Sequence, residues 1–270
     1  MISALKGGTN VSEKEPLLYR EEKGIARITF NRPEALNAMT KEVLQQLASL
    51  LDKMRVNDAV KAVIITGTGE AFSAGADIKF LNQALPLEVR EFAQMAVSVN
   101  QKIETLGKVA VAAINGFALG GGLELAEACM LRMAVPDARL GHPEVRIGAI
   151  AGFGGTTRLP RLIGKGRATE LLVTGRLVTA EEALQIGLVT RIVEPENLLS
   201  AAENLVLEIV SQSAVAVRMT WEAIHRGMNL TLEESTLLGA DYFGLVASTE
   251  DFREGTKSFL EKSTPSFKGR

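Results

Sequence analysis

The sequence is poor in the residues that build disulfides and metal sites. Its 270 residues include one cysteine, Cys129, and two histidines, His142 and His225. A single cysteine cannot form an intramolecular disulfide, and the two histidines lie far apart without the spacing of metal ligands. The composition therefore excludes a disulfide scaffold, and we expect no metal.

Excess charge and long hydrophobic runs are also lacking. Lys and Arg total 30 against 32 Asp and Glu, a formal net charge of −2, so neither nucleic acid nor an anionic membrane is expected as a partner. The most apolar stretch, residues 109–123, contains Asn115 and four glycines and is too short to span a bilayer. Residues 1–15 resemble neither a secretory signal nor a transit peptide. We therefore expect a soluble, cytoplasmic protein.

The hydrophobic pattern of the first part of the chain indicates an α/β fold. Residues 17–20 and 25–30 flank a turn at 22–24 and predict a β-hairpin. Strands and helices then alternate, which favours right-handed crossovers between mainly parallel strands. The predicted strands are 60–66, 108–114 and 131–135, and the predicted helices are 40–55 (with Thr40 as N-cap), 87–106 and 123–129.

After Gly155 the pattern becomes helical, and only residues 188–193 read as a strand. We place a boundary near residue 195, between a core of residues 1–195 and a helical region of residues 196–270. Apolar side chains in the helical region are expected to pack on the core or on a partner subunit. The predicted helices are 156–163, 167–174, 180–186, 196–211, 214–226, 232–248 and 249–262.

Three glycine clusters are candidates for phosphate-binding loops. Residues 120–125 (GGGLEL) and 152–157 (GFGGTT) lack the third glycine of a dinucleotide-binding fingerprint. Residues 164–166 (GKG) lack the Ser or Thr that completes a nucleotide-hydrolase loop. A nucleotide-binding function is therefore disfavoured.

Three other segments carry candidate chemistry. In residues 71–79, Gly75 permits a turn before a helix start at Asp77, where a backbone N–H can point into a cleft. Three glycines at 120–122 precede a helix and expose N–H groups at its positive end, with Glu124 in an apolar first turn. Glu144 follows Pro143 in a turn. Each segment alone also has a purely structural interpretation, as a capped turn or a first-turn acid.

Together, in this order, the three segments resemble the crotonase superfamily, and enoyl-CoA hydratases in particular. The resemblance covers nearly the whole chain. It implies an α/β fold of the crotonase-like (ClpP/crotonase) type, a spiral of β-β-α units with a helical C-terminal region. It also implies a homotrimer or a homohexamer built as a dimer of trimers. Further matching motifs lie at residues 31–33, 36–38, 154–160, 174–175, 180–183, 187–189, 248–251, 254–255 and 259–262.

The resemblance also implies an activity, the reversible syn addition of water to a 2-enoyl-CoA to give a 3-hydroxyacyl-CoA. The thioester carbonyl is expected between the backbone N–H groups of Ala76 and Gly121. Glu124 is expected to orient and deprotonate water, and Glu144 to exchange a proton with Cα. Coenzyme A is then part of the acyl-CoA substrate, and no separate cofactor is expected.

Coenzyme A contacts are likewise carried over from the family. Phe259 and Lys262 match positions that reach the nucleotide from a neighbouring subunit, and Arg32 and Lys79 are candidate phosphate partners. We interpret Ser73, Cys129 and His142 as structural. The remaining expected contacts are Ala35, Leu36, Ala74, Ala76, Asp77 and Ile78.

The sequence departs from the family pattern at two positions beside the acyl pocket. Many hydratases have proline where this chain has Ala151 and a small residue where it has Phe153. A phenylalanine there either shortens the pocket or points away from it, so the sequence leaves chain-length preference open.

Three other functions stay open. A Δ3-Δ2-enoyl-CoA isomerase would need one glutamate, and a branched or cyclic dienoyl-CoA hydratase would keep both. Some superfamily members bind RNA, but the net charge of −2 disfavours that role. Retention of both Glu124 and Glu144 favours the hydratase.

Overall fold

The computed structural model describes residues 15–270. The N-terminal segment interpreted above therefore lies, apart from Glu15, outside the described residues. Strands β1 (Leu17–Glu22) and β2 (Ile25–Phe30) form the predicted antiparallel hairpin. Lys23 and Gly24 form the turn of this hairpin, with φ of 51° and 77°. Two successive residues with left-handed backbone angles match the twist of strands joined by a two-residue turn.

The larger sheet continues from this hairpin with parallel strands. Its order is β1-β2-β3-β5-β7-β10, and every neighbouring pair after the hairpin is parallel. β5 is buried along its whole length, as expected of a strand covered on both faces. The added strands are β3 (Ala62–Gly67), β5 (Val109–Ile114), β7 (Leu131–Ala134) and β10 (Arg191–Ile192).

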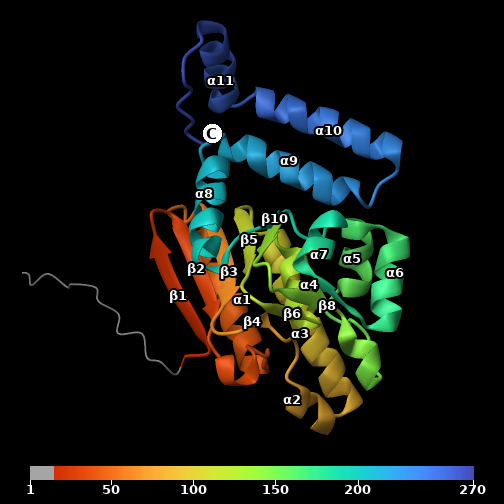
Figure 1. The fold of residues 1–270 in the computed structure, drawn as a ribbon. Helices are drawn as coiled ribbons and strands as arrows, with labels where there is room; N and C mark the ends of the chain where they lie inside the picture. The colour runs from red at the N-terminus through yellow and green to blue at the C-terminus, as the bar shows by residue number, and fades with distance from the viewer. Residues whose placement is uncertain (1–14) are drawn as a thin grey trace, which may run out of the picture.

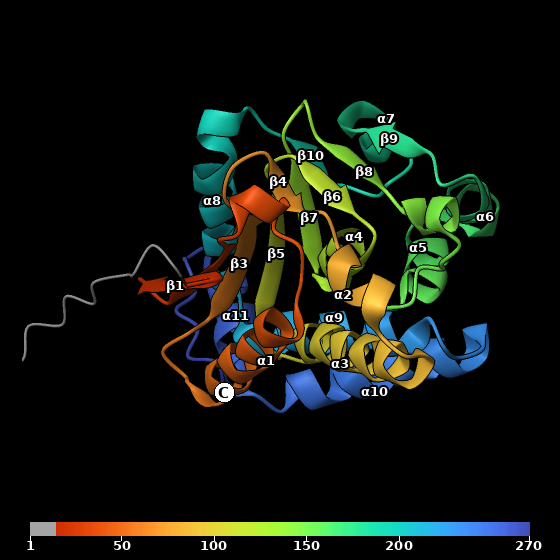
Figure 2. The same ribbon diagram turned by 90° about the horizontal axis from the view of Figure 1, so that it is seen from below.

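A second sheet has the order β4-β6-β8-β9, parallel except for the last pair. Its strands are β4 (Ala71–Ser73), β6 (Phe117–Leu119), β8 (Arg139–Gly141) and β9 (Leu177–Thr179). The pairs β3/β4, β5/β6 and β7/β8 each place one strand in each sheet, which is the expected β-β-α spiral (Figure 2).

The short strands correct two sequence predictions. Residues 71–73, which precede the predicted turn at Gly75, form β4, a strand absent from the predicted ones, and residues 188–193 are not the only strand after Gly155, because β9 precedes them. β10 is also only two residues long. Three-residue strands are set by hydrogen bonds to distant segments, and they are too short to show an alternating pattern.

Helices surround the two sheets. The first, α1 (Lys41–Val56), is capped as predicted by Thr40, whose Oγ1 accepts a hydrogen bond from the Val43 N–H at 3.2 Å. Within the core, α4 (Gly121–Ala128) is buried at every residue. The other core helices are α2 (Ile78–Gln83), α3 (Pro86–Glu104), α5 (Gly155–Ile163), α6 (Lys165–Thr174) and α7 (Ala180–Gln185). Short 3-10 helices lie at η1 (Pro33–Ala35), η2 (Pro143–Ile147) and η3 (Pro195–Asn197).

Among the C-terminal helices, α8 (Leu198–Val210) packs closely on the core, whereas the three that follow it touch the core at few points, such as the hydrogen bond from Trp221 Nε1 to the Glu104 carbonyl at 3.0 Å. α8 buries Leu198, Ala202, Leu205 and Val206 and packs on β3, β5 and β7. α9 (Ala214–Gly227) and α10 (Leu232–Ala247) bury no residue and pack on each other, followed by α11 (Glu250–Glu261) (Figure 1). The boundary near residue 195 stays a prediction, and the change of packing follows α8. No helix within residues 15–270 is both long and apolar enough to cross a membrane.

Successive turns of the spiral stack closely at their corners. The Phe117 N–H donates to the Glu70 carbonyl at 3.1 Å, and a β-carbon on Gly116 would lie 2.0 Å from that same oxygen. The backbones of two turns of the spiral are therefore in direct contact at this corner, and no flexible side chain could move to relieve a clash.

We predict that Gly116→Ala destabilises the protein by about 2 kcal/mol or more, because the corner must open. Gly166→Ala is the matched control: Gly166 lies in α6, where a β-carbon would meet no other atom within 4 Å. It should be neutral or gain roughly 0.5 kcal/mol. Urea unfolding of both variants measures the difference, and equal stabilities would contradict the stacked corner.

Candidate active site

The first candidate amide belongs to Ala76, between β4 and α2. Met39 and Ala76 form an isolated parallel bridge, in which the Met39 N–H donates to the Gly75 carbonyl at 2.7 Å and the Asp77 N–H donates to the Met39 carbonyl at 3.0 Å. In such a bridge the Ala76 N–H points away from Met39. Within residues 15–270 it donates to no protein acceptor.

The second amide belongs to Gly121, the first residue of α4. A first-turn N–H has no partner inside its own helix, and that of Gly121 has none elsewhere in the described part of the chain. Gly75, with φ of 94°, lies against this helix start: a β-carbon on it would be 2.9 Å from the Gly121 nitrogen. The two loops therefore touch, and both leave a backbone N–H free.

Glu124 lies in the first turn of α4 and is only 1% exposed. Its Oε1 accepts hydrogen bonds from the Phe153 N–H at 2.7 Å and the Gly155 N–H at 2.6 Å. These bonds fix the carboxylate from one side. Its Oε2 has no hydrogen bond to any described residue.

The environment of Glu124 favours its protonated form. Burial raises its pKa from 4.5 to about 7, against the opposing effects of the Gly155 N–H and of His142. The neighbouring carboxylates of Glu127 and Glu144 raise the pKa further. Glu124 can therefore both give and accept a proton near neutral pH.

Glu144 lies in the first turn of η2 and is half-buried. A β-carbon on Gly120 would be 3.0 Å from its Oε1, so the carboxylate lies against the residue that precedes the free Gly121 amide. Its Oε2 is buried and has no hydrogen-bond partner among residues 15–270. The structure thus brings Glu124, Glu144 and the two amides to one place.

Sequence analysis missed the pairing of His142 with Glu127. The His142 Nε2 lies 2.8 Å from the Glu127 Oε1, and its Nδ1 lies 3.8 Å from the Glu144 Oε1. Burial opposes a charge on the imidazole, yet Glu127 and Glu144 together raise the His142 pKa to about 10. Glu127 follows Glu124 by three residues on the same helix, which is the one signal that pointed to it.

Ser73 and Cys129 make local contacts away from this cluster. The Ser73 hydroxyl donates to the Asn37 carbonyl at 2.8 Å and accepts from the Gly75 N–H at 3.2 Å, which supports the amide loop. Burial raises the pKa of Cys129 to about 12, so its thiol is not a nucleophile at neutral pH.

Phe153 points toward the amide loop. A β-carbon on Gly121 would lie 2.6 Å from its ring, and the ring packs edge-on against Phe92 with centroids 5.5 Å apart. Of the two orientations left open by the sequence, the structure has the one that places the ring beside the site.

Most of the residues expected to contact coenzyme A lie next to one another, around the loop that holds Ala76. The Ala74 N–H donates to the Leu36 carbonyl at 2.9 Å, which joins the η1 segment to the loop that holds Ala76. Leu36 and Ile78 are exposed at the surface beside it.

The remaining expected contacts lie at the ends of two helices. Ala35 ends η1, and Asp77 caps α2 by accepting a hydrogen bond from the Lys79 N–H. Arg32 Nη1 donates to the Ala38 carbonyl at 2.7 Å and lies 3.8 Å from Asp77, whereas the Lys79 side chain is exposed.

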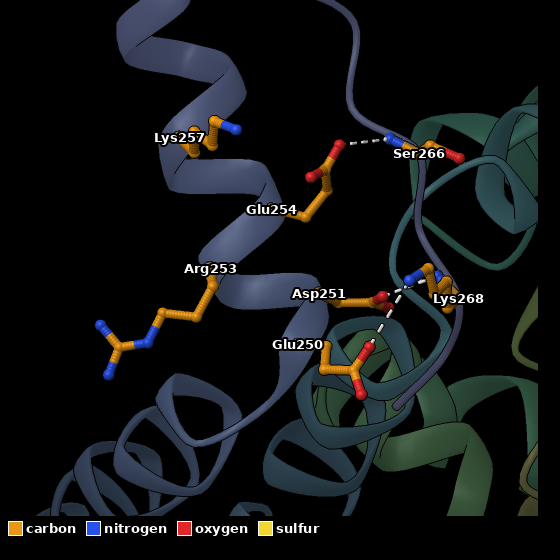
Figure 3. A pocket seen from close by; sticks show the side chains of 7 residues that line it. All are labelled: Glu250, Asp251, Arg253, Glu254, Lys257, Ser266 and Lys268. Atoms are coloured by element: carbon orange, nitrogen blue, oxygen red, sulfur yellow. Dashed lines mark hydrogen bonds and ion pairs between the residues drawn. The ribbon is translucent and has the colours of Figure 1, made fainter.

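Phe259 and Lys262 lie apart from the site, at the end of α11 (Figure 1). Phe259 is 84% exposed, and Lys262 ends the helix with φ of 54°. The start of α11 is anchored by the C-terminal segment: Asp251 accepts from the N–H groups of Lys268 (2.6 Å) and Gly269 (Figure 3). Within one chain, these two residues do not reach the site.

Across residues 15–270, no group of three or more His, Cys, Asp or Glu side chains is arranged to hold a metal ion. The arrangement offers proton transfer and backbone stabilisation of a developing negative charge.

The two-sheet spiral is the crotonase fold that the sequence predicted. Residues 20–270 match the sequence family described as Enoyl-CoA hydratase/isomerase. The structure superposes on that of an enoyl-CoA hydratase from Bacillus anthracis with a TM-score of 0.90 and 37% identity, covering 95% of this chain and 100% of the other. The chain belongs to the enoyl-CoA hydratase/isomerase family, and the family prediction is confirmed.

Two curated relatives are similar over almost their full length. A crotonyl-CoA hydratase from Syntrophomonas wolfei is 41% identical over 254 residues, which cover 94% of this chain and 98% of the relative. A short-chain-enoyl-CoA hydratase from Clostridium acetobutylicum is 41% identical over 251 residues, with coverage of 93% and 96%.

We predict that the raised pKa of Glu124 makes stability depend on pH. Between pH 4.5 and about 7 the unfolded chain loses this proton while the folded protein keeps it, so stability falls as pH rises. Glu124→Gln should remove this effect, so that its advantage over the parent grows across that window to roughly 3 kcal/mol at its upper end. Denaturant titrations at several pH values measure it, with exposed Glu208→Gln as control. A constant difference between variant and parent would contradict a raised pKa.

Proposed function

We propose that this protein is an enoyl-CoA hydratase, which adds water reversibly and in the syn sense to a 2-enoyl-CoA to give a 3-hydroxyacyl-CoA. The family implies an acyl-CoA substrate. The observation that supports hydration is the presence of two carboxylates, Glu124 and Glu144, beside two free backbone amides.

The two amides would bind the thioester oxygen. As water attacks Cβ, negative charge develops on this oxygen, and the N–H groups of Ala76 and Gly121 are already free to donate to it. The Gly121 N–H also lies at the positive end of α4. Donors held in place need no reorganisation, and removing one such donor typically costs about 10²–10³ in rate.

The two carboxylates would move the protons. Glu124, fixed through Oε1, has Oε2 available to accept a proton from the water whose oxygen bonds to Cβ. Glu144 would deliver its proton to Cα, so water contributes one hydroxyl and the net proton count is unchanged. Hydration therefore leaves Glu124 protonated and Glu144 ionised, and the pair is reset when Glu124 releases a proton to solvent and Glu144 takes one up; dehydration runs the same steps in reverse.

We further propose a preference for short, straight acyl chains. The Phe153 ring occupies space beside Gly121, and the two curated relatives are named for crotonyl and short-chain substrates. A bulky ring at this position limits the length of a chain that extends past the reacting carbons.

Other features are proposals that follow from the family. Coenzyme A would lie along Ala35, Leu36 and residues 74–78, with Phe259 and Lys262 contributed by a neighbouring subunit. Exposed apolar residues on α9 and α10, including Leu237 and Phe243, suit a homotrimer or homohexamer. Residues 1–195 would then be the catalytic core and residues 196–270 the oligomerisation region of a cytoplasmic enzyme.

We predict that the protein hydrates crotonyl-CoA, followed as loss of the absorbance of the conjugated thioester, with kcat/KM falling from four- to ten-carbon substrates. Glu124→Gln and Glu144→Gln should each lower kcat by about 10²–10⁴. The double variant should be little worse than either single variant, because the pair acts as a unit. Glu208→Gln, on the exposed side of α8, should be unaffected.

Two outcomes would redirect the proposal. Inactivity of the parent on straight, branched and cyclic enoyl thioesters would remove the hydratase. Conversion of a 3-enoyl-CoA that survives Glu124→Gln and is lost in Glu144→Gln would instead indicate the isomerase, which needs one glutamate.

A further inference from the structure

Four ionisable side chains lie on two short segments beside the site. Glu124 and Glu127 are one helical turn apart on α4, and His142 and Glu144 flank Pro143 at the end of β8. The imidazole bridges the segments: its Nε2 is 2.8 Å from the Glu127 Oε1, and its Nδ1 is 3.8 Å from the Glu144 Oε1. His142 is therefore the link between α4 and Glu144.

The bridge is buried and incompletely paired. His142 is 1% exposed and the Glu127 side chain is fully covered. Three buried atoms have no hydrogen-bond partner among the described residues: the Glu127 Oε2, the His142 Nδ1 and the Glu144 Oε2. Buried carboxylates without a compensating charge are costly. A doubly protonated imidazole supplies that charge, since it donates to Glu127 and directs its second N–H toward Glu144.

Other cations near Glu127 are engaged elsewhere. Arg158 on α5 makes a two-pronged ion pair with Glu104 of α3, at 2.6 and 2.9 Å. Arg132 on β7 donates to the carbonyls of Leu188 and Cys129 at 2.7 and 2.8 Å. Within residues 15–270, His142 is thus the only cationic side chain in ion-pair contact with Glu144.

The backbone holds the imidazole in this orientation. A β-carbon on Gly155 would lie 2.9 Å from the His142 Cε1 and 3.1 Å from the Glu124 Cγ. The chain that binds Glu124 through its N–H groups therefore also packs against the ring. Pro143 restricts the backbone between His142 and Glu144.

We propose that His142, held by Glu127, is a positioning residue that fixes the direction of the Glu144 carboxylate and holds a positive charge beside it. The proposal rests on the hydratase function, because it assigns His142 a part in the proton exchange that Glu144 would make with Cα. Glu127 acts on Glu144 indirectly, because it orients the imidazole ring of His142.

This arrangement also affects Glu124. The charge on His142 lowers the pKa of the Glu124 carboxyl group, against the larger effect of burial. The imidazolium therefore extends the ionised, proton-accepting form of Glu124 to lower pH. Burial lowers and the two carboxylates raise the His142 pKa, to about 10 on balance, so the charge is present throughout the neutral range.

The kinetic test uses His142→Gln and Glu127→Gln, with His225→Gln on α9 as the matched control. Each of the first two should lower kcat for crotonyl-CoA by about tenfold to a hundredfold with KM within about threefold, as expected when a supporting group is lost. His142→Gln should also move the acid limb of the pH profile of kcat/KM to higher pH, by about one unit, because a charge that lowers the Glu124 pKa is lost. Glu127→Gln should move it by less, because that variant also removes a carboxylate that raises the Glu124 pKa. His225→Gln should leave rate and profile unchanged.

A second measurement does not depend on activity. The chain has two histidines, so the His225→Gln variant carries the imidazole ¹⁵N signal of His142 alone. That signal should report two bonded protons at pH 7, and adding Glu127→Gln should lower the His142 pKa by more than about one unit. If His142→Gln fails to fold, Glu127→Gln and this titration still decide the question.

Different results would overturn different claims. A parent that is inactive on every enoyl thioester would remove the proposed function. An active parent whose pH profile is unchanged by His142→Gln and Glu127→Gln would remove the positioning role and leave the hydratase intact. A neutral His142 imidazole at pH 7 would also overturn it.

Discussion

The contact between the Gly75 loop and the start of α4 is the constraint on which the site depends. Gly75 and Gly120 have φ of 94° and 49°, and a β-carbon on Gly75 would lie 2.7 Å from the Leu119 carbonyl oxygen. Only glycine allows both the angles and the approach. Because the loops meet here, the amides of Ala76 and Gly121, which are 45 residues apart in sequence, lie beside one another, and neither donates to an acceptor among residues 15–270.

The spiral supplies the second requirement, which is the convergence of acids. One turn carries Glu124 and Glu127 on α4, and the next carries His142 and Glu144 after β8. The loop at residues 151–155 then closes over Glu124 with two N–H groups. Burying several ionisable groups together lowers the stability of the folded protein, and such unfavourable arrangements are found mainly at functional sites. The remaining core is mostly apolar, with side chains such as Ile28, Ile64 and Val111 fully covered.

The sequence predicted the parts of this structure that are local. The hairpin, the Thr40 cap and the position of Glu124 in a buried first turn follow from turn residues, capping and helical periodicity. The three-residue strands of the second sheet do not, because distant partners create them. The spiral itself came only from the resemblance. The His142–Glu127 pair was missed for the same reason, since its contact joins α4 to the segment after β8.

The central claim, that two backbone donors and two acids surround one reacting centre, is tested most directly by a crystal structure with a bound 3-ketoacyl-CoA, which cannot be hydrated. The account predicts the thioester oxygen at about 2.7–3.1 Å from both the Ala76 and the Gly121 nitrogens, with Glu124 and Glu144 on one face of the acyl chain. A thioester oxygen bound elsewhere, or a chain that passes between the two carboxylates and separates them, would contradict it.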